Sequence, residues 1–148
     1  MRTTGTILAL VVIGCLLPQL ANAERTVVLI TGESCPVNEI STLDIRKAYL
    51  SVSVSIDGHT IRPFRLGGDE MLSQIFYQSI VAMSQKSYER RALSMALKFG
   101  TPRPAVFEDV DSAADAVRRL RCGVLYLWKE DADSLDGVRI IKLLWQGD

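Results

Sequence analysis

The spacing of apolar residues changes along the chain in a way that predicts strands alternating with helices. Residues 26–31 (TVVLIT) and 123–128 (GVLYLW) are short, uninterrupted apolar runs, a pattern typical of strands buried on both faces of a sheet. The same criteria predict a strand at 138–145, preceded by an acidic turn at 131–137, and a shorter strand at 105–110. Strands of this kind form the centre of a sheet that helices cover.

Residues 51–66 are expected to form a β-hairpin. Val and Ser alternate in the first arm, Asp57 and Gly58 give a turn signal, and apolar residues alternate again in the second arm. Pro63 has no N–H to donate to a neighbouring strand. The second arm is therefore expected to be an edge strand or an irregular one.

Four segments show the spacing of amphipathic helices. The clearest is 69–83, in which six residues form one stripe at helical spacing: Leu72, Ile75, Phe76, Ser79, Ile80 and Met83. Shorter patterns predict helices that start near Ser41, near Ser84, and at Asp111 or Ser112, and that end near 50, 99 and 121. Strands and helices alternate without an internal repeat or a low-complexity linker, so a single α/β domain is expected.

Residues 1–23 have the three-part pattern of a secretory signal peptide. Arg2 gives a positive start, 7–17 is an unbroken run of apolar residues and glycine, and 21–23 (ANA) supplies a small-residue cleavage site. The apolar run is well short of the roughly 20 residues that cross a bilayer, so a transmembrane anchor is not expected. Cleavage after Ala23 leaves one domain at 24–148.

Lipoprotein processing is a rival interpretation of the same segment. Residues 12–15 (VIGC) resemble a lipobox, which would leave Cys15 as the lipidated first residue. Against this interpretation, the apolar run continues past Cys15. Both interpretations predict an exported protein.

Composition excludes several classes of protein. The chain has 148 residues, of which 48% are hydrophobic and 23% charged, and a mean hydropathy of +0.17, which excludes a disordered chain or a cysteine-rich toxin. The formal net charge is +0, and losing Arg2 with the signal peptide makes it one unit negative. Domains that bind nucleic acid are normally strongly basic, so nucleic acid is not an expected partner.

Two cysteines, Cys35 and Cys122, remain after removal of the signal peptide. In an oxidising compartment they either pair or stay as two separate buried thiols, and the sequence leaves both alternatives open. A disulfide that closes a loop of this length would contribute roughly 4 kcal/mol. His59 is the only histidine, so a metal site made by the protein is not expected.

Three stretches, taken in order, carry a resemblance to a known family. They are the strand 26–31 with the helix after it, residues 99–104 (FGTPRP) in the place of an FTGxGxPP-like segment, and 121–127 (RCGVLYL) in the place of a PGAIGYV-like strand start. In this order they resemble the phosphate-type periplasmic substrate-binding proteins of ABC transporters, in a short form. The resemblance implies a type II periplasmic-binding-protein-like fold, with a mixed sheet flanked by helices. Full-length members close two lobes of about 100 to 150 residues each around an anion, so 24–148 is expected to form a single lobe or two reduced ones.

The resemblance also implies where an anion would bind, at the start of the helix near residue 69. Gly67 and Gly68 leave backbone N–H groups accessible there, and Arg65 would pair with a phosphate oxygen. Asp69 and Glu70 depart from the Gly-, Ser- and Thr-rich segment of the family. Their negative charges repel an anion, and they are also ordinary residues for the start of a helix.

Ser34 is a further candidate ligand contact. It follows the first predicted strand, and open α/β folds bind ligands beyond the ends of their strands. The alternative is a loop serine near Pro36.

Two classes of function follow from the sequence. The first is an exported module of the periplasm that binds phosphate or a related small oxyanion for an ABC transporter. The second is an interaction or sensory adaptor that docks on a membrane transporter or receptor. Lys86, Arg90, Arg91 and Lys98 make one predicted helix basic, which is either a solvated face or a docking patch for an acidic partner. No acid/base pair or nucleophile constellation stands out, so neither an enzymatic activity nor a cofactor is expected.

Overall fold

The computed structural model describes residues 24–147. The segment 1–23, with the proposed cleavage site after Ala23 and the lipobox cysteine Cys15, lies outside the described residues.

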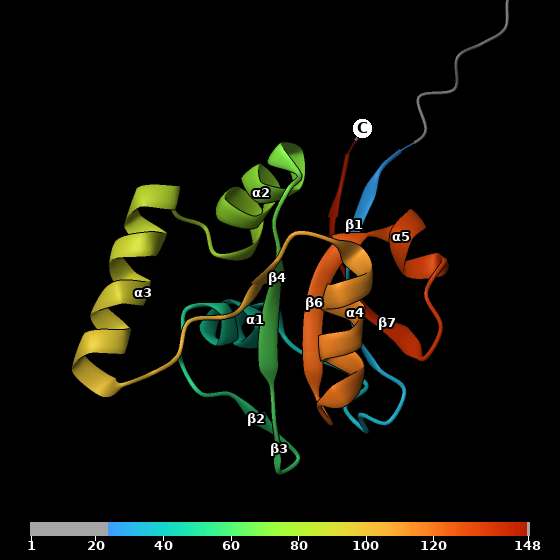
Figure 1. The fold of residues 1–148 in the computed structure, drawn as a ribbon, viewed down its shortest axis with the longest axis horizontal. Coiled ribbons are helices and arrows are strands. Elements are labelled where there is room, and N and C mark those ends of the chain that lie inside the picture. The colour runs from blue at the N-terminus through green and yellow to red at the C-terminus, as the bar shows by residue number, and fades with distance from the viewer. Residues whose placement is uncertain (1–23, 148) are drawn as a thin grey trace, which may run out of the picture.

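A mixed five-stranded sheet forms the centre of the domain (Figure 1). Its strand order is β5-β4-β6-β1-β7, and the bounds are β1 Thr26–Gly32, β4 Arg62–Leu66, β5 Val106–Phe107, β6 Gly123–Trp128 and β7 Val138–Gln146. β4 runs parallel to both β5 and β6, whereas β1 runs antiparallel to its neighbours β6 and β7. The mixed sheet expected from the sequence is confirmed.

The two apolar runs of the sequence are the most deeply buried strands. Every residue of β6 is buried, and only the first residue of β1 is partly exposed. They lie next to each other, with Leu29 opposite Tyr126. A strand covered on both faces needs apolar residues at every position, which explains the absence of alternation in these segments.

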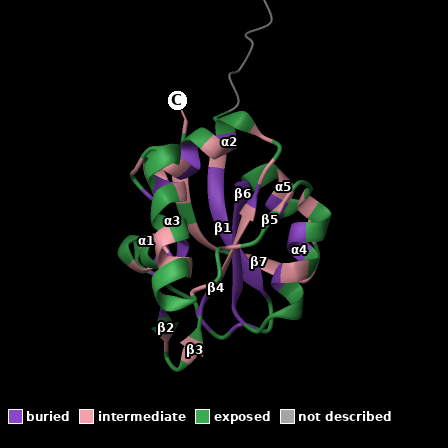
Figure 2. Ribbon diagram, turned by 60° about the vertical axis from the view of Figure 1, so that its left-hand side comes forward, coloured by how far each residue is buried: buried purple, intermediate pink, exposed green. Residues whose placement is uncertain are grey.

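Helices cover both faces of the sheet, as Figure 2 shows. Their bounds are α1 Thr42–Tyr49, α2 Glu70–Ile75, a π-helical segment η1 Phe76–Ile80, α3 Gln85–Phe99, α4 Val110–Arg119 and α5 Lys129–Asp133. On one face α4 packs against β4 and β6, close enough that a Cβ on Gly123 would lie 3.0 Å from the Cα of Val117. On the other face, Tyr49 of α1 and Phe76 of η1 contact Tyr126 of β6.

The expected hairpin is shorter than predicted, and its second arm is not an edge strand. β2 (Ser55–Ile56) and β3 (His59–Thr60) form a small hairpin, and β4 lies between β5 and β6 in the main sheet. The expectation drawn from Pro63 is therefore wrong. N–H groups of successive strand residues point to opposite sides: Arg62 donates to Cys122 beside β6, and Arg65 donates to Ala105 beside β5. Pro63 faces the second side, at a level where β5 has not begun, so its missing N–H leaves no partner unpaired.

Three helical predictions need correction. The helix expected over 69–83 is α2 followed by η1; the N–H of Val81 bonds to the carbonyl of Phe76, five residues earlier, and this wider turn ends the helix. The cap of α4 is Asp109, two residues before Asp111 and three before Ser112, the two predicted caps, because its side chain accepts from the N–H of Ser112. The acidic turn expected at 131–137 begins inside the short helix α5.

Cys35 and Cys122 form a disulfide, with the two Sγ atoms 2.10 Å apart. It ties the loop after β1 to the residue that precedes β6, and both cysteines are buried. A disulfide is consistent with an extracytoplasmic location. Across residues 24–147, none of the helices has the length and apolar character needed to cross a bilayer.

Candidate functional site

The two glycines singled out by the sequence connect β4 to α2. Gly68 has φ +79°, a left-handed conformation that glycine adopts without strain. A carboxylate lies beside them: a Cβ on Gly67 would lie 3.1 Å from Oε1 of Glu108, and one on Gly68 would lie 3.2 Å from the Glu108 carbonyl oxygen. The space next to these glycines, where the family resemblance places an oxyanion, therefore holds a negative charge.

Asp69 occupies the start of α2. Its Oδ1 accepts from the N–H of Leu72 at 2.9 Å, and its Oδ2 accepts from Nε1 of Trp128 at 2.7 Å. Burial alone would raise the pKa of the Asp69 carboxyl. The hydrogen bonds from Leu72 and Trp128 outweigh this effect, so the pKa lies below its ordinary value. Asp69 thus caps the helix, as the capping interpretation of this residue predicts.

A cation and two further acids lie near this end of the sheet. The guanidinium of Arg25 lies over the Trp128 ring, 3.6 Å from its centroid, and one of its nitrogens is 3.2 Å from Oε1 of Glu130. Burial and the neighbouring charge of Glu130 raise the pKa of Asp131. The guanidinium of Arg25 is therefore already paired with an aromatic ring and a carboxylate.

Arg65 lies in an aromatic cluster. Its guanidinium carbon is 4.4 Å from the ring centroid of Phe76, 4.8 Å from that of Tyr88 and 5.4 Å from that of Tyr77. Its Nη2 donates to the Tyr77 hydroxyl at 2.9 Å, and Nη1 is 3.8 Å from Glu89. Only 12% of the side chain is exposed, so the guanidinium has internal partners on most sides.

The electrostatics of this cluster support an internal role for Arg65. Burial lowers the pKa of the Arg65 guanidinium, but Tyr126, Tyr88 and Tyr77 more than reverse this effect, and the pKa lies above its ordinary value. Burial raises the pKa of Tyr88 to about 12, against a smaller lowering by Arg65. The cluster therefore holds a permanent cation among neutral phenols at physiological pH.

Ser34 lies far from the glycines in the sheet. β1 is antiparallel to β6 while β4 is parallel to it, so the end of β1 lies at the edge where β4 begins, not where it ends. Ser34 is exposed in the loop after Gly32. The structure thus groups Arg65, Gly67 and Gly68 on one segment without adding Ser34, and ligand binding by any of them stays a prediction.

Glu108 is the residue at this edge that sequence reasoning missed. It directly follows β5, and the carboxyl ends of the parallel strands β4 and β5 meet at one edge of the sheet. The sequence offered little signal, because Glu108 lies inside the strand predicted at 105–110, whereas the observed β5 ends at Phe107. Within residues 24–147, no three His, Cys, Asp or Glu side chains gather as a metal site.

Comparison with known proteins supports the fold and leaves the ligand open. No family model and no curated protein matches the sequence. Among solved structures, the chain is similar to a Clostridium perfringens protein described as a phosphate ABC transporter substrate-binding protein and solved with bound phosphate (TM-score 0.59, 14% identity). It is also similar to PstS from Borrelia burgdorferi (TM-score 0.57, 10% identity).

These likenesses concern one part of larger proteins. Each covers 80% of this chain but only 45% and 47% of the two solved chains, so the chain spans less than half the length of the proteins it matches. At such low identity they show the fold alone. The α/β fold resembles one lobe of a periplasmic-binding-protein-like protein, in agreement with the single-lobe alternative of the sequence analysis.

Proposed function

We propose that this chain is an exported domain, related to one lobe of a phosphate-type substrate-binding protein, that acts by docking on an acidic protein partner in the cell envelope. The observation that carries the proposal is a surface on α3. We define this α3 surface by three exposed apolar and four basic residues: Leu93, Leu97, Phe99, Lys86, Arg90, Arg91 and Lys98.

α3 is loosely attached to the rest of the domain. Only Tyr88 and Ala92 of its 15 residues are buried. Leu97 is 78% exposed and Phe99 is 71% exposed, and Figure 1 shows α3 standing apart from the sheet. Leu93 and Leu97 are four positions apart and therefore lie on one side of the helix, and exposed apolar side chains that lie together mark interaction surfaces.

The charge on α3 points to the chemistry of the partner. The helix carries four basic residues and one acidic residue, Glu89. Glu89 already interacts with Arg65, and with Arg103 at 3.4 Å. The basic side chains are therefore left to attract an acidic surface, while Leu93 and Leu97 supply the apolar contact. The membrane transporter or receptor expected as a partner would present an apolar groove with an acidic rim.

The glycine segment gives less support to capture of a free anion by this lobe alone. The Glu108 carboxylate lies beside Gly67 and Gly68, and Asp69 already accepts from the N–H of Leu72 at the helix start. Arg65, the expected phosphate partner, is engaged by aromatic rings and Tyr77.

Site-specific photocrosslinking in cells tests the proposal. A photoreactive amino acid at position 97 should give one dominant crosslinked protein with an acidic rim around its binding groove, and the purified pair should bind more weakly as salt rises. The matched control is the same amino acid at position 71, where Met71 is 45% exposed on α2. Equal crosslinking from both positions, or binding that salt does not weaken, would contradict the docking role.

Oxyanion capture for a transporter is the second candidate, supported by the likeness to a protein solved with bound phosphate. Calorimetry with inorganic phosphate separates the two functions. Docking alone predicts no phosphate binding by the wild-type domain, whereas oxyanion capture predicts saturable binding that Glu108→Gln strengthens by removing the repelling charge.

A further inference from the structure

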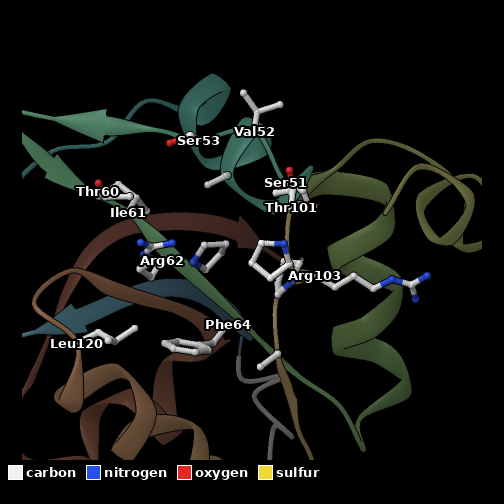
Figure 3. A pocket seen from close by; sticks show the side chains of 15 residues that line it. Ser51, Val52, Ser53, Thr60, Ile61, Arg62, Phe64, Thr101, Arg103 and Leu120 are labelled. Atoms are coloured by element: carbon white, nitrogen blue, oxygen red, sulfur yellow. The ribbon is translucent and has the colours of Figure 1, made fainter. Parts of the chain in front are cut away.

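A cavity lies at the opposite end of β4 from the glycine segment. It has a volume of about 250 Å³ and opens between the start of β4, the loop after α1 and the connector 101–105 (Figure 3). We call it the β4 pocket. Its lining residues are Ala48, Ser51, Val52, Ser53, Thr60, Ile61, Arg62, Pro63, Phe64, Thr101, Pro102, Arg103, Pro104, Ala105 and Leu120.

The β4 pocket exists because the sheet has a gap at this level. β5 pairs with β4 only at Arg65 and Leu66, so no strand lies beside the first half of β4 on that side. At the end of the connector, the carbonyl of Ala105 accepts from the N–H of Arg65. Pro102 and Pro104 restrict the connector to extended backbone and keep it from closing the gap.

The lining has apolar walls and a positive opening. Proline rings, Phe64 and Leu120 form the walls, and the pocket has two arginines but no carboxylate among its lining residues. Arg103 extends toward α3 in Figure 3 and pairs with Glu89. Arg62 is exposed, and no carboxylate of residues 24–147 lies within ion-pair distance of it. Arg62 is thus the charge available to a ligand.

Ser51 adds an unsatisfied polar group to the same pocket. Its side chain lines the cavity, the residue is 8% exposed, and its buried Oγ has no hydrogen-bond partner among the described residues. Its backbone also adopts φ +63°, which is unfavourable for a residue with a Cβ. A buried hydroxyl without a partner is uncommon, and strained residues are found preferentially where ligands bind.

We infer that the β4 pocket binds a small monocarboxylate with a compact aromatic or branched aliphatic body. Arg62 would pair with the carboxylate, the Ser51 hydroxyl would accept or donate a hydrogen bond, and Phe64 and the prolines would contact the apolar body. The volume is below the roughly 300–1,000 Å³ of pockets for drug-sized ligands, which limits the ligand to about the size of benzoate. Inorganic phosphate, which has no apolar part, would leave these walls without a contact.

Titration of the ¹⁵N-labelled domain with benzoate, with isovalerate and with inorganic phosphate tests the inference. We expect saturable shifts from the two carboxylates at amides lining the β4 pocket, such as those of Val52 and Thr101, and none from phosphate there. Arg62→Gln should weaken benzoate binding at least tenfold. Arg119→Gln, which removes an exposed arginine that does not line the pocket, should leave the affinity unchanged.

Ser51→Gly separates loss of binding from loss of folding. Glycine tolerates φ +63°, so this variant should unfold at a higher temperature than the wild type while binding benzoate more weakly. Leu120→Trp should fill the cavity and abolish the shifts. The inference is overturned by an absence of saturable shifts up to roughly 10 mM carboxylate, a concentration well above a weak millimolar Kd. It is equally overturned by wild-type affinity in Arg62→Gln, or by shifts confined to Gly67 and Gly68.

Discussion

Replacing Arg65 distinguishes a structural cation from a ligand-binding one. The guanidinium contacts Phe76 and Tyr88 at 4.4 and 4.8 Å and donates to Tyr77. Two desolvated cation–π contacts are worth about 1–2 kcal/mol each, and a hydrogen bond from a charged donor is worth about 2 kcal/mol. Two effects oppose this stabilisation. Burial removes water from the cation, and the Arg65 Nε is buried without a hydrogen-bond partner, which costs about 1–2 kcal/mol.

The balance of these terms differs between two substitutions. Arg65→Met keeps the apolar stem and removes the buried charge, so we expect a loss of about 1–2 kcal/mol in the free energy of unfolding. Arg65→Ala also leaves a cavity among the aromatic rings, which raises the expected loss to about 3–5 kcal/mol. Arg103→Ala is the matched control, because Arg103 shares the partner Glu89 but has a side chain 45% exposed; its effect should stay within about 0.5 kcal/mol.

Urea unfolding followed by circular dichroism gives these free energies, and calorimetry with phosphate is run on the same samples. Unchanged stability in Arg65→Ala would refute the structural role. If that variant also lost a phosphate affinity that the wild type possessed, Arg65 would be a ligand contact, as the sequence resemblance implies.

Three other predictions follow from the same structure. Replacing Cys35 and Cys122 by Ala should lower the free energy of unfolding by about 4–5 kcal/mol, because the disulfide closes a loop with a sequence separation of 87; a loss below about 1 kcal/mol, measured by urea unfolding, would contradict this entropic account. Asp69→Asn should cost about 1 kcal/mol at pH 7, since it removes the charge that accepts from Trp128 at a partly exposed site. The folded pKa of Asp69 is lowered, so the stability difference between the wild type and Asp69→Asn is fully present above the unfolded pKa of about 3.9. It disappears as the pH falls through the folded pKa, and a difference that grew in acid would contradict the prediction. Gly123→Ala should cost about 1–3 kcal/mol in a thermal or urea melt, because its Cβ would lie 3.0 Å from the backbone of Val117; wild-type stability would show that α4 can shift away.

The sequence predicted those parts of the fold that depend on local pattern. β1 and β6 were predicted because a strand buried on both faces must be apolar throughout, and α3 because Ser84 and Gly100 bound it. The position of β4 was not predictable in this way. Pro63 indicates an edge strand to any local rule, and only the shortness of β5, formed more than 40 positions later, makes an inner position acceptable.

The candidate site shows the same limit more sharply. Arg65 followed by two glycines and a helix start has the local chemistry of an anion site. What the residues do depends on side chains distant in sequence: Tyr77 and Tyr88 take the guanidinium, and Glu108 takes the space beside the glycines. Periodicity and spacing carry no information about such contacts, because a side chain's neighbours across the sheet are set by topology.

The placement of β1 has a consequence for how the domain reaches its native state. β1 lies between β6 and β7, and its residues pair with partners about a hundred positions later, such as Thr26 with Gln146 and Val27 with Trp128. Pairings of such long range give a high contact order and slow, late closure of the sheet. A chain emerging N-terminus first, from a ribosome or through a translocation channel, therefore cannot complete its central sheet until β7 has emerged. The same topology that buries β1 therefore leaves the central sheet incomplete until β7, the last strand of the described residues, has paired with it.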